Sequence, residues 1–279
     1  MFDRLGDLSR LTPSGSILLL SVAALSPQDA LSPERFARKL SRISPRPELR
    51  PDPTNAVAAD EDAARFGQAL FFDARLSPDE RFSCATCHDP ALAFTDGRSL
   101  PQGRGPLMRN TPTLFDVGRR RWLFWDGRTD TLWAQIRHPL ESPHEMDGDR
   151  LALAHLVSAD EGYSAQYEAL FGQLPELEDS QRFPSRAKPM PEHREDPRHL
   201  TWQAMSASDR ALIDEVLVNV SKSLAAYQSR LETGPSKLDL FAEAYLAGDP
   251  AGGGHLSPEA RRGLELFLGK GQCTLCHMG

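Results

Sequence analysis

The sequence predicts a mostly helical fold made of two copies of one unit. Nowhere do apolar and polar residues alternate over a stretch long enough for a β-strand. Residues 208–231 instead carry apolar side chains every three to four positions, which is typical of the buried face of a helix. The pattern Ala-Arg-x-Gly-x-x-Leu-Phe occurs in residues 62–71 and again in residues 258–267, and this repeat predicts the duplication.

The other helices are predicted from apolar periodicity and from end signals. Pro139 is expected to end the helix before it, because proline lacks a backbone N–H. Ser257 is the expected N-cap of the last helix, and Gly269 is expected to close it. Residues 26–57 are expected to form a polar, proline-rich lead-in. The predicted helices span residues 59–70, 129–137, 151–158, 164–171, 208–231, 237–247 and 257–269.

Every cysteine of the chain lies in one of two Cys-x-x-Cys-His pentapeptides, residues 84–88 and 273–277. This pattern is the attachment signature of c-type haem, in which both thiols bond the porphyrin and the histidine binds the iron. A four-cysteine zinc site and a thioredoxin-like redox pair both leave the two histidines unexplained. Structural disulfides are disfavoured because cysteines separated by only two residues make a strained bridge. We therefore predict two covalently bound haem c groups, held by Cys84, Cys87, His88, Cys273, Cys276 and His277.

Each haem motif follows one copy of the repeat, so we expect two cytochrome c-like haem domains. The first is expected to span residues 31–205, with residues 173–203, which hold five prolines, as a solvated surface insertion; partner docking is the alternative. The second is expected to begin at residue 206 and to be incomplete, because only two residues follow His277. We therefore expect this chain to be a truncated fragment. Gly67 and Gly263 are expected where a helix approaches the porphyrin closely.

Length and charge narrow the classes of function. With 279 residues, of which 40% are apolar, the chain can form two domains with cores. A net charge of −7 argues against nucleic acid as a partner and favours a redox partner with a basic patch.

The N-terminus contains an apolar run, residues 17–25, that is too short to span a bilayer. We expect a secretory signal in residues 1–30, with a short buried helix as the alternative. Because haem c is normally attached outside the cytoplasm, we expect a periplasmic protein without a stable membrane span.

From about Pro51 onward, the sequence resembles the bacterial di-haem cytochrome c peroxidase family, which includes MauG-like enzymes. The resemblance implies two helical haem c domains that face each other. In this family the N-terminal haem reacts with hydrogen peroxide, and the C-terminal haem accepts electrons from a small cytochrome c or copper protein. The segments that carry the resemblance, in this order, are residues 70–77, 83–88, 94–97, 109–113, 124–128 and 145–146.

The resemblance also implies roles for single residues. His88 would be the proximal ligand of the peroxide-reactive haem, and His277 that of the electron-entry haem. Glu145 matches the family's carboxylate, which takes a proton from peroxide and returns it to the departing oxygen. Gln135 matches the glutamine of the distal pocket, and Trp125 matches the tryptophan between the two haems.

Two further matches concern ligands. Asn110 matches a family ligand of a calcium ion between the domains; since calcium binds several oxygens, one amide does not define a site. Alignment on residues 109–110 puts Gln102 near the place where many relatives have a second histidine ligand. No histidine lies between His88 and His138, so we predict a five-coordinate, accessible iron. The remaining histidines are expected at surface or capping positions, with His144 as a further candidate beside the catalytic carboxylate.

The resemblance favours a peroxidase that reduces hydrogen peroxide to water with electrons from a small redox protein. A MauG-like oxidation of residues on a protein substrate is the first alternative, and the missing second histidine keeps it open. A non-catalytic electron-transfer cytochrome is the second alternative, and it gives Glu145 no role. The oligomeric state stays open, with a homodimer as one option.

Overall fold

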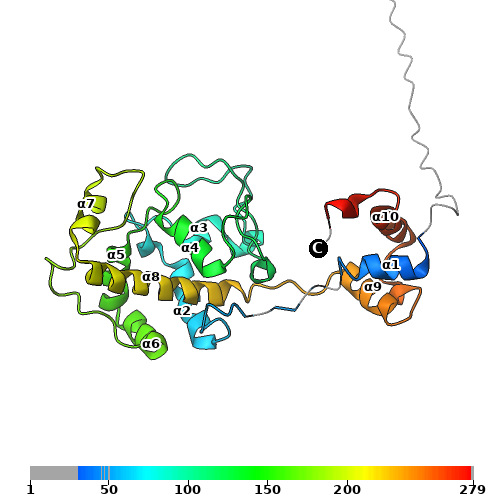
Figure 1. Cartoon of the computed structure of the whole chain (residues 1–279), viewed down its shortest axis with the longest axis horizontal. Helices are drawn as coiled ribbons and strands as arrows, with labels where there is room; N and C mark the ends of the chain where they lie inside the picture. Colours follow the sequence, from blue (N-terminus) through cyan, green and yellow to red (C-terminus); the bar gives the residue numbers. More distant parts are fainter. Residues whose placement is uncertain (1–30, 45, 47, 50, 278–279) are drawn as a thin grey trace, which may run out of the picture. The chain divides into compact units, whose positions relative to one another are not determined.

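The computed structural model describes residues 31–44, 46, 48–49 and 51–277 (Figure 1). In this part of the chain the regular elements are α-helices and short 3-10 turns, with isolated β-bridges and no strand. The predicted mostly helical fold is therefore confirmed. None of the described helices combines the length and the apolar character that a membrane span requires. The expected signal segment, residues 1–30, lies outside the described residues.

The chain divides into two compact units, which differ from the predicted domains. One unit comprises residues 47–234. The other combines the described part of residues 1–46 with residues 235–277. The predicted boundary at residues 205/206 is corrected, because α8 (Ala207–Gln228) packs on α2 (Glu61–Phe72) in the core of the first unit.

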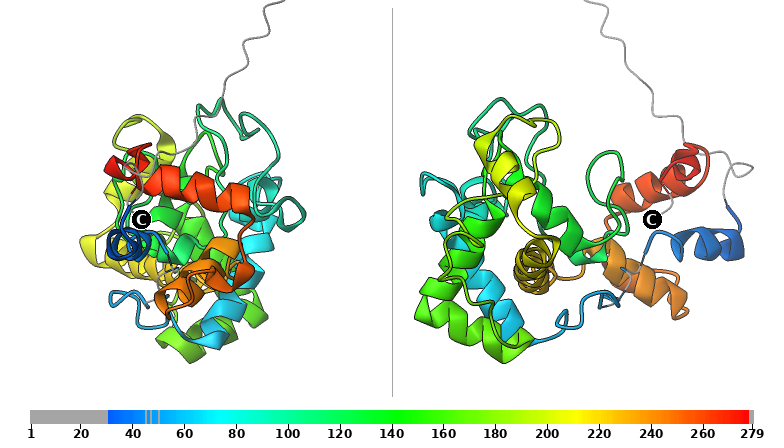
Figure 2. Two further views of the ribbon diagram at one scale, coloured as in Figure 1. Left: turned by 90° about the vertical axis from the view of Figure 1, so that its right-hand side faces the viewer. Right: turned by 60° about the vertical axis from the view of Figure 1, so that its left-hand side comes forward.

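Helices α2 and α8 cross at the centre of the larger unit (Figures 1 and 2). Gly67 faces the backbone of α8, since a Cβ added there would lie 2.0 Å from the carbonyl oxygen of Ser223. Gly67 therefore serves helix–helix packing, which corrects its expected role against a porphyrin. A Cβ added at Gly263 would meet no described atom within 4 Å, so no close contact explains that glycine.

The other helices of this unit surround the α2–α8 pair. They are α3 (Cys84–Cys87), α4 (Leu132–Glu141), α5 (Arg150–Ala159), α6 (Glu161–Phe171) and α7 (Pro197–Ala204). Aspartate side chains accept hydrogen bonds from first-turn N–H groups that have no partner inside the helix. The residues that cap α2, α5, α6 and α7 in this way are Asp60, Asp149, Asp160 and Asp196.

Helix α4 was predicted to end before Pro139. It continues past this residue to Glu141, so that prediction is wrong. A proline removes the hydrogen bond that its own N–H would have donated, but the residues after it can still donate theirs. The last turn is closed without it, because the Ser142 N–H donates to the His138 carbonyl at 2.9 Å.

Residues 173–203 were predicted to form a solvated surface insertion. They instead pack on the core of the larger unit. Their backbone is largely irregular up to α7. His155 of α5 holds this segment, with its Nε2 3.3 Å from the Phe183 carbonyl oxygen. Four buried apolar side chains of the segment belong to the main apolar cluster, and they are Leu177, Phe183, Ala187 and Trp202 of α7.

The smaller unit packs three helices around its own apolar core: α1 (Pro33–Leu40), α9 (Lys237–Leu246) and α10 (Pro258–Leu268). Helix α1 lies within the stretch predicted as a lead-in. The expected N-cap of α10 is confirmed, since Ser257 accepts a hydrogen bond from the Ala260 N–H. The core side chains are Phe36, Leu40, Phe241, Ala242, Leu264 and Leu268.

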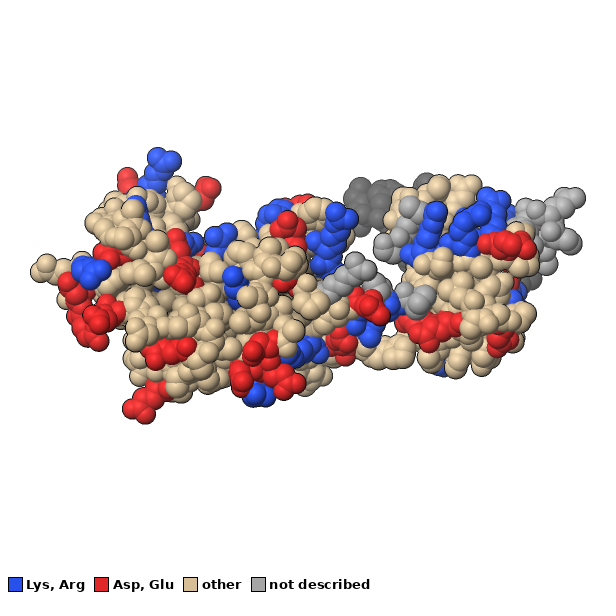
Figure 3. Space-filling view, turned by 60° about the horizontal axis from the view of Figure 1, so that its bottom comes forward, with Lys and Arg blue, Asp and Glu red and all other residues tan. Residues whose placement is uncertain are grey.

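Acidic and basic side chains are interspersed on the face of the molecule drawn in Figure 3. Neither sign forms a continuous stripe among the described residues of that face. The surface charge there is therefore mixed, although the chain as a whole is acidic.

Candidate active site

A cavity of about 1470 Å³ opens within residues 82–228 of the larger unit. It exceeds the roughly 300–1,000 Å³ that most small-molecule sites offer, so it has room for a group as large as a porphyrin. All the predicted site residues of the first haem motif and its surroundings line it, and these are Cys84, Cys87, His88, Asn110, Trp125, Gln135 and Glu145.

The first haem motif forms a single helical turn, α3, at the wall of this cavity. Ser83 and Thr86 form a capping box, in which the Ser83 N–H donates to the Thr86 hydroxyl at 2.9 Å. The His88 N–H donates to the Cys84 carbonyl, also at 2.9 Å, and so ends the turn. Local hydrogen bonds thus hold both thiols and the imidazole at one place.

The His88 ring is oriented for coordination through Nε2. Its Nδ1 lies 2.9 Å from the carbonyl oxygen of Phe94, which fits an Nδ1–H donor. The turn that presents this carbonyl has left-handed backbone at Ala93 and Phe94 (φ 56° and 57°). Burial lowers the pKa of His88, so the imidazole is kept neutral with a lone pair on Nε2. A histidine whose other ring nitrogen is hydrogen-bonded in this way is typical of a metal ligand.

The thiols of Cys84 and Cys87 are held in their protonated form. Burial raises the pKa of the Cys84 thiol to about 12. Burial also raises the pKa of Cys87, with smaller contributions from the carboxylates of Asp96 and Glu145. Neither pair of cysteines forms a disulfide. These surroundings do not suit a thiolate nucleophile, whereas attachment of a porphyrin removes the thiols altogether.

Glu145 follows α4, and Gln135 lies on that helix. The Glu145 side chain is partly buried, and this burial raises the pKa of its carboxyl. A hydrogen bond from Ser142 and the positive charge of Arg128 oppose the shift. A carboxyl group with a raised pKa can accept and return a proton closer to neutral pH than an exposed glutamate can. The carboxyl and the Gln135 amide line the same cavity as His88.

Trp125 and Asn110 line the cavity at its exposed side. The Trp125 side chain is 84% exposed, and the Arg109 guanidinium lies 5.6 Å from its ring centroid. Asn110 donates a side-chain hydrogen bond to the Arg98 carbonyl. Among the described residues, no cluster of three or more histidines, cysteines or carboxylates is arranged to hold a metal ion. Calcium binding therefore rests on the resemblance alone.

His138 also lines the cavity, although the sequence suggested a surface position. It lies on α4 three residues after Gln135, hence on the same helix face. This spacing is the signal that could have identified it. His144 is placed differently: its carbonyl accepts from the Gly105 N–H at 3.1 Å, and its ring packs on that loop. His199 is buried, and its Nδ1 accepts from the Met190 N–H, so it is not a surface residue.

The second haem motif lies in the smaller unit, where residues Cys273–Leu275 form a 3-10 turn after α10. Cys273 is half-buried, whereas Cys276 and His277 are exposed. The His277 ring lies 6.2 Å from that of Phe267, measured between centroids. In the part of the chain that the structure describes, this motif is much less enclosed than the first.

The family model of the di-haem cytochrome c peroxidases matches residues 61–248. The chain is 31% identical over 267 residues to the methylamine utilization protein MauG of Methylorubrum extorquens; the match covers 94% of this chain and 61% of that protein. It is 30% identical over 277 residues to the cytochrome c551 peroxidase of Pseudomonas aeruginosa, covering 97% and 64%, respectively.

The fold of this chain is also similar to that of a solved diheme peroxidase structure. The diheme peroxidase BthA from Burkholderia thailandensis matches with a TM-score of 0.52 and 28% sequence identity, over 83% of this chain and 50% of BthA. The chain thus spans between half and two thirds of the length of these relatives.

Proposed function

Since this chain belongs to the di-haem cytochrome c peroxidase family, we propose that its larger unit is a peroxidatic domain. Its activity would be the reduction of hydrogen peroxide to water, with electrons from a small cytochrome c or copper protein. One observation carries the proposal: the partly buried carboxyl of Glu145 and the oriented imidazole of His88 line one cavity large enough for a haem.

Cys84, Cys87 and His88 would hold the haem of this domain. When bound, the haem would supply an iron site for peroxide and pass on the electrons that cleave the O–O bond. The net reaction takes two electrons and two protons for each peroxide and yields two waters. The protein's part is to hold the imidazole in one tautomer through the Phe94 carbonyl and to supply a proton carrier at Glu145.

Glu145 would carry a proton between the two peroxide oxygens. Its carboxylate would take the proton of one peroxide oxygen, and the resulting carboxylic acid would give it to the other, departing oxygen. The raised pKa of Glu145 supports this role, because it brings the acid and base forms closer in free energy near neutral pH. The Gln135 amide, on the same cavity wall, would donate a hydrogen bond that orients the peroxide.

Cys273, Cys276 and His277 would hold a second haem, which receives electrons from the donor protein. Trp125 would lie on the electron path between the haems, and its exposed indole is free to meet another surface. Asn110 would contribute an oxygen to a calcium site. Location in the periplasm, a secretory signal and a possible homodimer are part of the same proposal and follow from the resemblance and from haem c attachment.

A MauG-like activity, in which peroxide drives the oxidation of residues on a protein substrate, is the second candidate. The surroundings of Gln102 keep this activity open, since Gln102 stands near the place of the second histidine of many relatives. The Gln102 amide oxygen accepts from Arg98 at 2.5 Å, and Gln102 is not among the residues that line the cavity. An accessible iron suits either activity.

The proposal is tested with the haem-loaded protein and its Glu145→Gln variant. The rate of haem oxidation after mixing with hydrogen peroxide is followed by stopped-flow absorbance. We expect the variant to react about 100-fold more slowly or worse, in line with the 10²–10⁴-fold that general acid–base catalysis contributes. An equal rate in both proteins would refute the role of Glu145. A reduced donor cytochrome that is oxidised at a matching rate distinguishes the peroxidase from the MauG-like enzyme.

A further inference from the structure

The loop between α4 and α5, residues 142–148, carries Glu145 and is held from outside by Lys188. The Lys188 side chain is only 1% exposed. Its ammonium donates to the Glu141 carbonyl at 2.9 Å, to Asp147 Oδ1 at 2.7 Å and to the Gly148 carbonyl at 2.8 Å. A lysine ammonium has three N–H donors, and each has its own acceptor here. The three acceptors lie on both sides of Glu145 in the sequence.

The charge of Lys188 is balanced within the same cluster. Asp147 also accepts from Arg198 Nη1 at 2.9 Å, and Arg198 in turn binds Asp196 through Nε and Nη2 at 3.0 and 2.8 Å. Two cations and two carboxylates thus alternate. A buried ammonium is tolerated only where it is paired and fully hydrogen-bonded, so displacement of the loop would leave Lys188 with unsatisfied donors. The loop is therefore restricted to one position.

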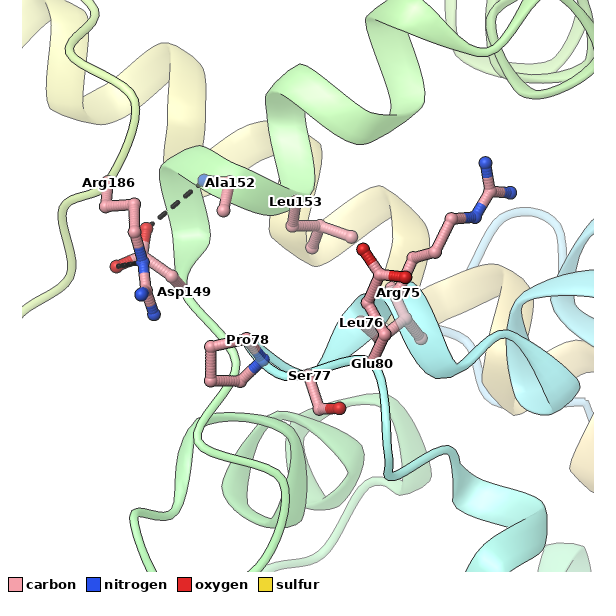
Figure 4. A pocket seen from close by; sticks show the side chains of 9 residues that line it. All are labelled: Arg75, Leu76, Ser77, Pro78, Glu80, Asp149, Ala152, Leu153 and Arg186. Atoms are coloured by element: carbon pink, nitrogen blue, oxygen red, sulfur yellow. Dashed lines mark hydrogen bonds and ion pairs between the residues drawn. The ribbon is translucent and has the colours of Figure 1, made fainter.

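Lys188 is itself fixed by its backbone neighbours. The Ala187 N–H donates to Asp149 Oδ1 at 2.8 Å, and this carboxylate also caps α5. Figure 4 shows Asp149 between the first turn of α5 and the side chain of Arg186, whose Nε lies 4.0 Å from Asp149 Oδ2. The Leu151 N–H closes the contact by donating to the Ala187 carbonyl at 3.3 Å. The segment thus presents the ammonium at a fixed place.

The loop's own hydrogen bonds complete the arrangement. The Glu145 N–H donates to the Ser142 carbonyl at 3.0 Å, and the Gly148 N–H donates to the Leu140 carbonyl at 2.7 Å. Asp147 has left-handed backbone, with φ 52°, a conformation that is uncommon outside glycine but that aspartate adopts more readily than most residues. Its two cationic partners, Lys188 and Arg198, bind the side chain in this conformation of the loop.

We propose that Lys188 is a positioning residue for Glu145: through Asp147 and two loop carbonyls it fixes the carboxyl relative to the haem cavity. The inference rests on the proposed function, since it assigns Lys188 a part in the proton transfer at that site. It gives residues 173–203 a purpose beyond packing. Lys188 does not touch the reacting atoms and acts only through the loop.

The first test measures the rate of the peroxide reaction in the haem-loaded protein, in a double-mutant cycle. Lys188→Met is expected to lower the rate by about tenfold to 100-fold, because a displacement of about 1 Å costs a rate factor of that order. In a Glu145→Gln background, the same substitution is expected to change the rate less than about twofold. An equal loss in both backgrounds, or no loss in either, overturns the proposal.

The second test does not depend on activity. Hydrogen exchange is measured on the haem-loaded protein without peroxide. We expect the amides of residues 145–148 to exchange at least about tenfold faster in Lys188→Met than in the unaltered chain, because a local opening that is easier by 1.4 kcal/mol exchanges tenfold faster. Arg182→Met is the matched control, since Arg182 belongs to the same segment and pairs with Asp209, away from the loop. Unchanged exchange in the loop overturns the proposal.

A replacement variant and a separate criterion for the proposed function complete the tests. If Lys188→Met does not fold, Asp147→Asn replaces it; the amide oxygen still accepts hydrogen bonds, so a smaller loss in the same direction is expected, and an unchanged rate overturns the proposal. If the unaltered, haem-loaded protein does not react with peroxide, the proposed function itself fails. Faster loop exchange in Lys188→Met would still appear in that case, so the two failures are distinguishable.

Discussion

The α-carbon of Gly67 in α2 lies against the backbone of Ser223 in α8, so close that a Cβ at residue 67 would fall 2.0 Å from the Ser223 carbonyl oxygen. Neither backbone segment can move without disturbing the helix to which it belongs. The crossing of α2 and α8, on which the larger unit is built, therefore requires a glycine at this position.

Gly67→Ala is expected to destabilise the larger unit by at least about 1–3 kcal/mol, the usual cost of overpacking a filled core. Gly263→Ala is the matched control from the other copy of the repeat. There a Cβ meets no described atom within 4 Å, and alanine favours helix by up to about 1 kcal/mol. Urea unfolding of the three proteins measures both effects. Equal destabilisation by the two substitutions would show that the Ser223 contact is not the cause.

The pH dependence of stability provides a second prediction, through Glu145. Burial raises the pKa of this carboxyl, so the folded chain binds its proton more tightly than the unfolded chain does. Stability is then lost as the pH rises from the ordinary glutamate pKa, about 4.3, through the folded value. Glu145→Gln removes this loss. We expect the variant to have the higher melting temperature at pH 7, with the difference vanishing below about pH 4.

Melting temperatures of the haem-loaded proteins between pH 4 and pH 8 check this prediction. Glu192→Gln, at an exposed position of the same unit, is the control and is expected to follow the unaltered chain. A difference for Glu145→Gln that grows on acidification would contradict the raised pKa.

The coordination of the first iron provides a third prediction. We expect the ferric protein to show a high-spin component in its absorption and electron paramagnetic resonance spectra, because no second histidine is supplied near Gln102. Cyanide is expected to convert this component to low spin within the mixing time of a manual experiment. Spectra in which both haems are fully low-spin, with His/His or His/Met ligation, would refute the five-coordinate site.

The sequence predicted those features whose causes are local. The haem motif, the Ser257 cap of α10 and the apolar stripe of α8 each lie within a few turns of chain, so periodicity and spacing were sufficient. All the predicted residues around the first haem motif line one cavity. They could be identified from the sequence because the family's motifs occur in the same order along this chain.

Features that depend on contacts between residues far apart in the sequence were missed. Lys188 lies in a segment rich in proline and charge, and the acceptors of its buried ammonium lie 40 or more residues away along the chain. Phe183 and Leu177 anchor the same segment, but two apolar residues without periodicity give no signal. The packing of α1 with α9 and α10 likewise depends on contacts between residues about 200 positions apart in the sequence, such as the hydrogen bond from Lys39 to the Leu268 carbonyl.

The number of covalently bound haems tests the central claim most directly. The chain is exported to a bacterial periplasm that attaches haem c, and the intact protein is then weighed by mass spectrometry after denaturation. We predict a mass that includes porphyrin bonded to Cys84 and Cys87, and the loss of one haem in the double variant Cys84→Ser, Cys87→Ser. A purified, folded chain without covalent porphyrin, or a double variant that keeps the same number of haems, would contradict the account.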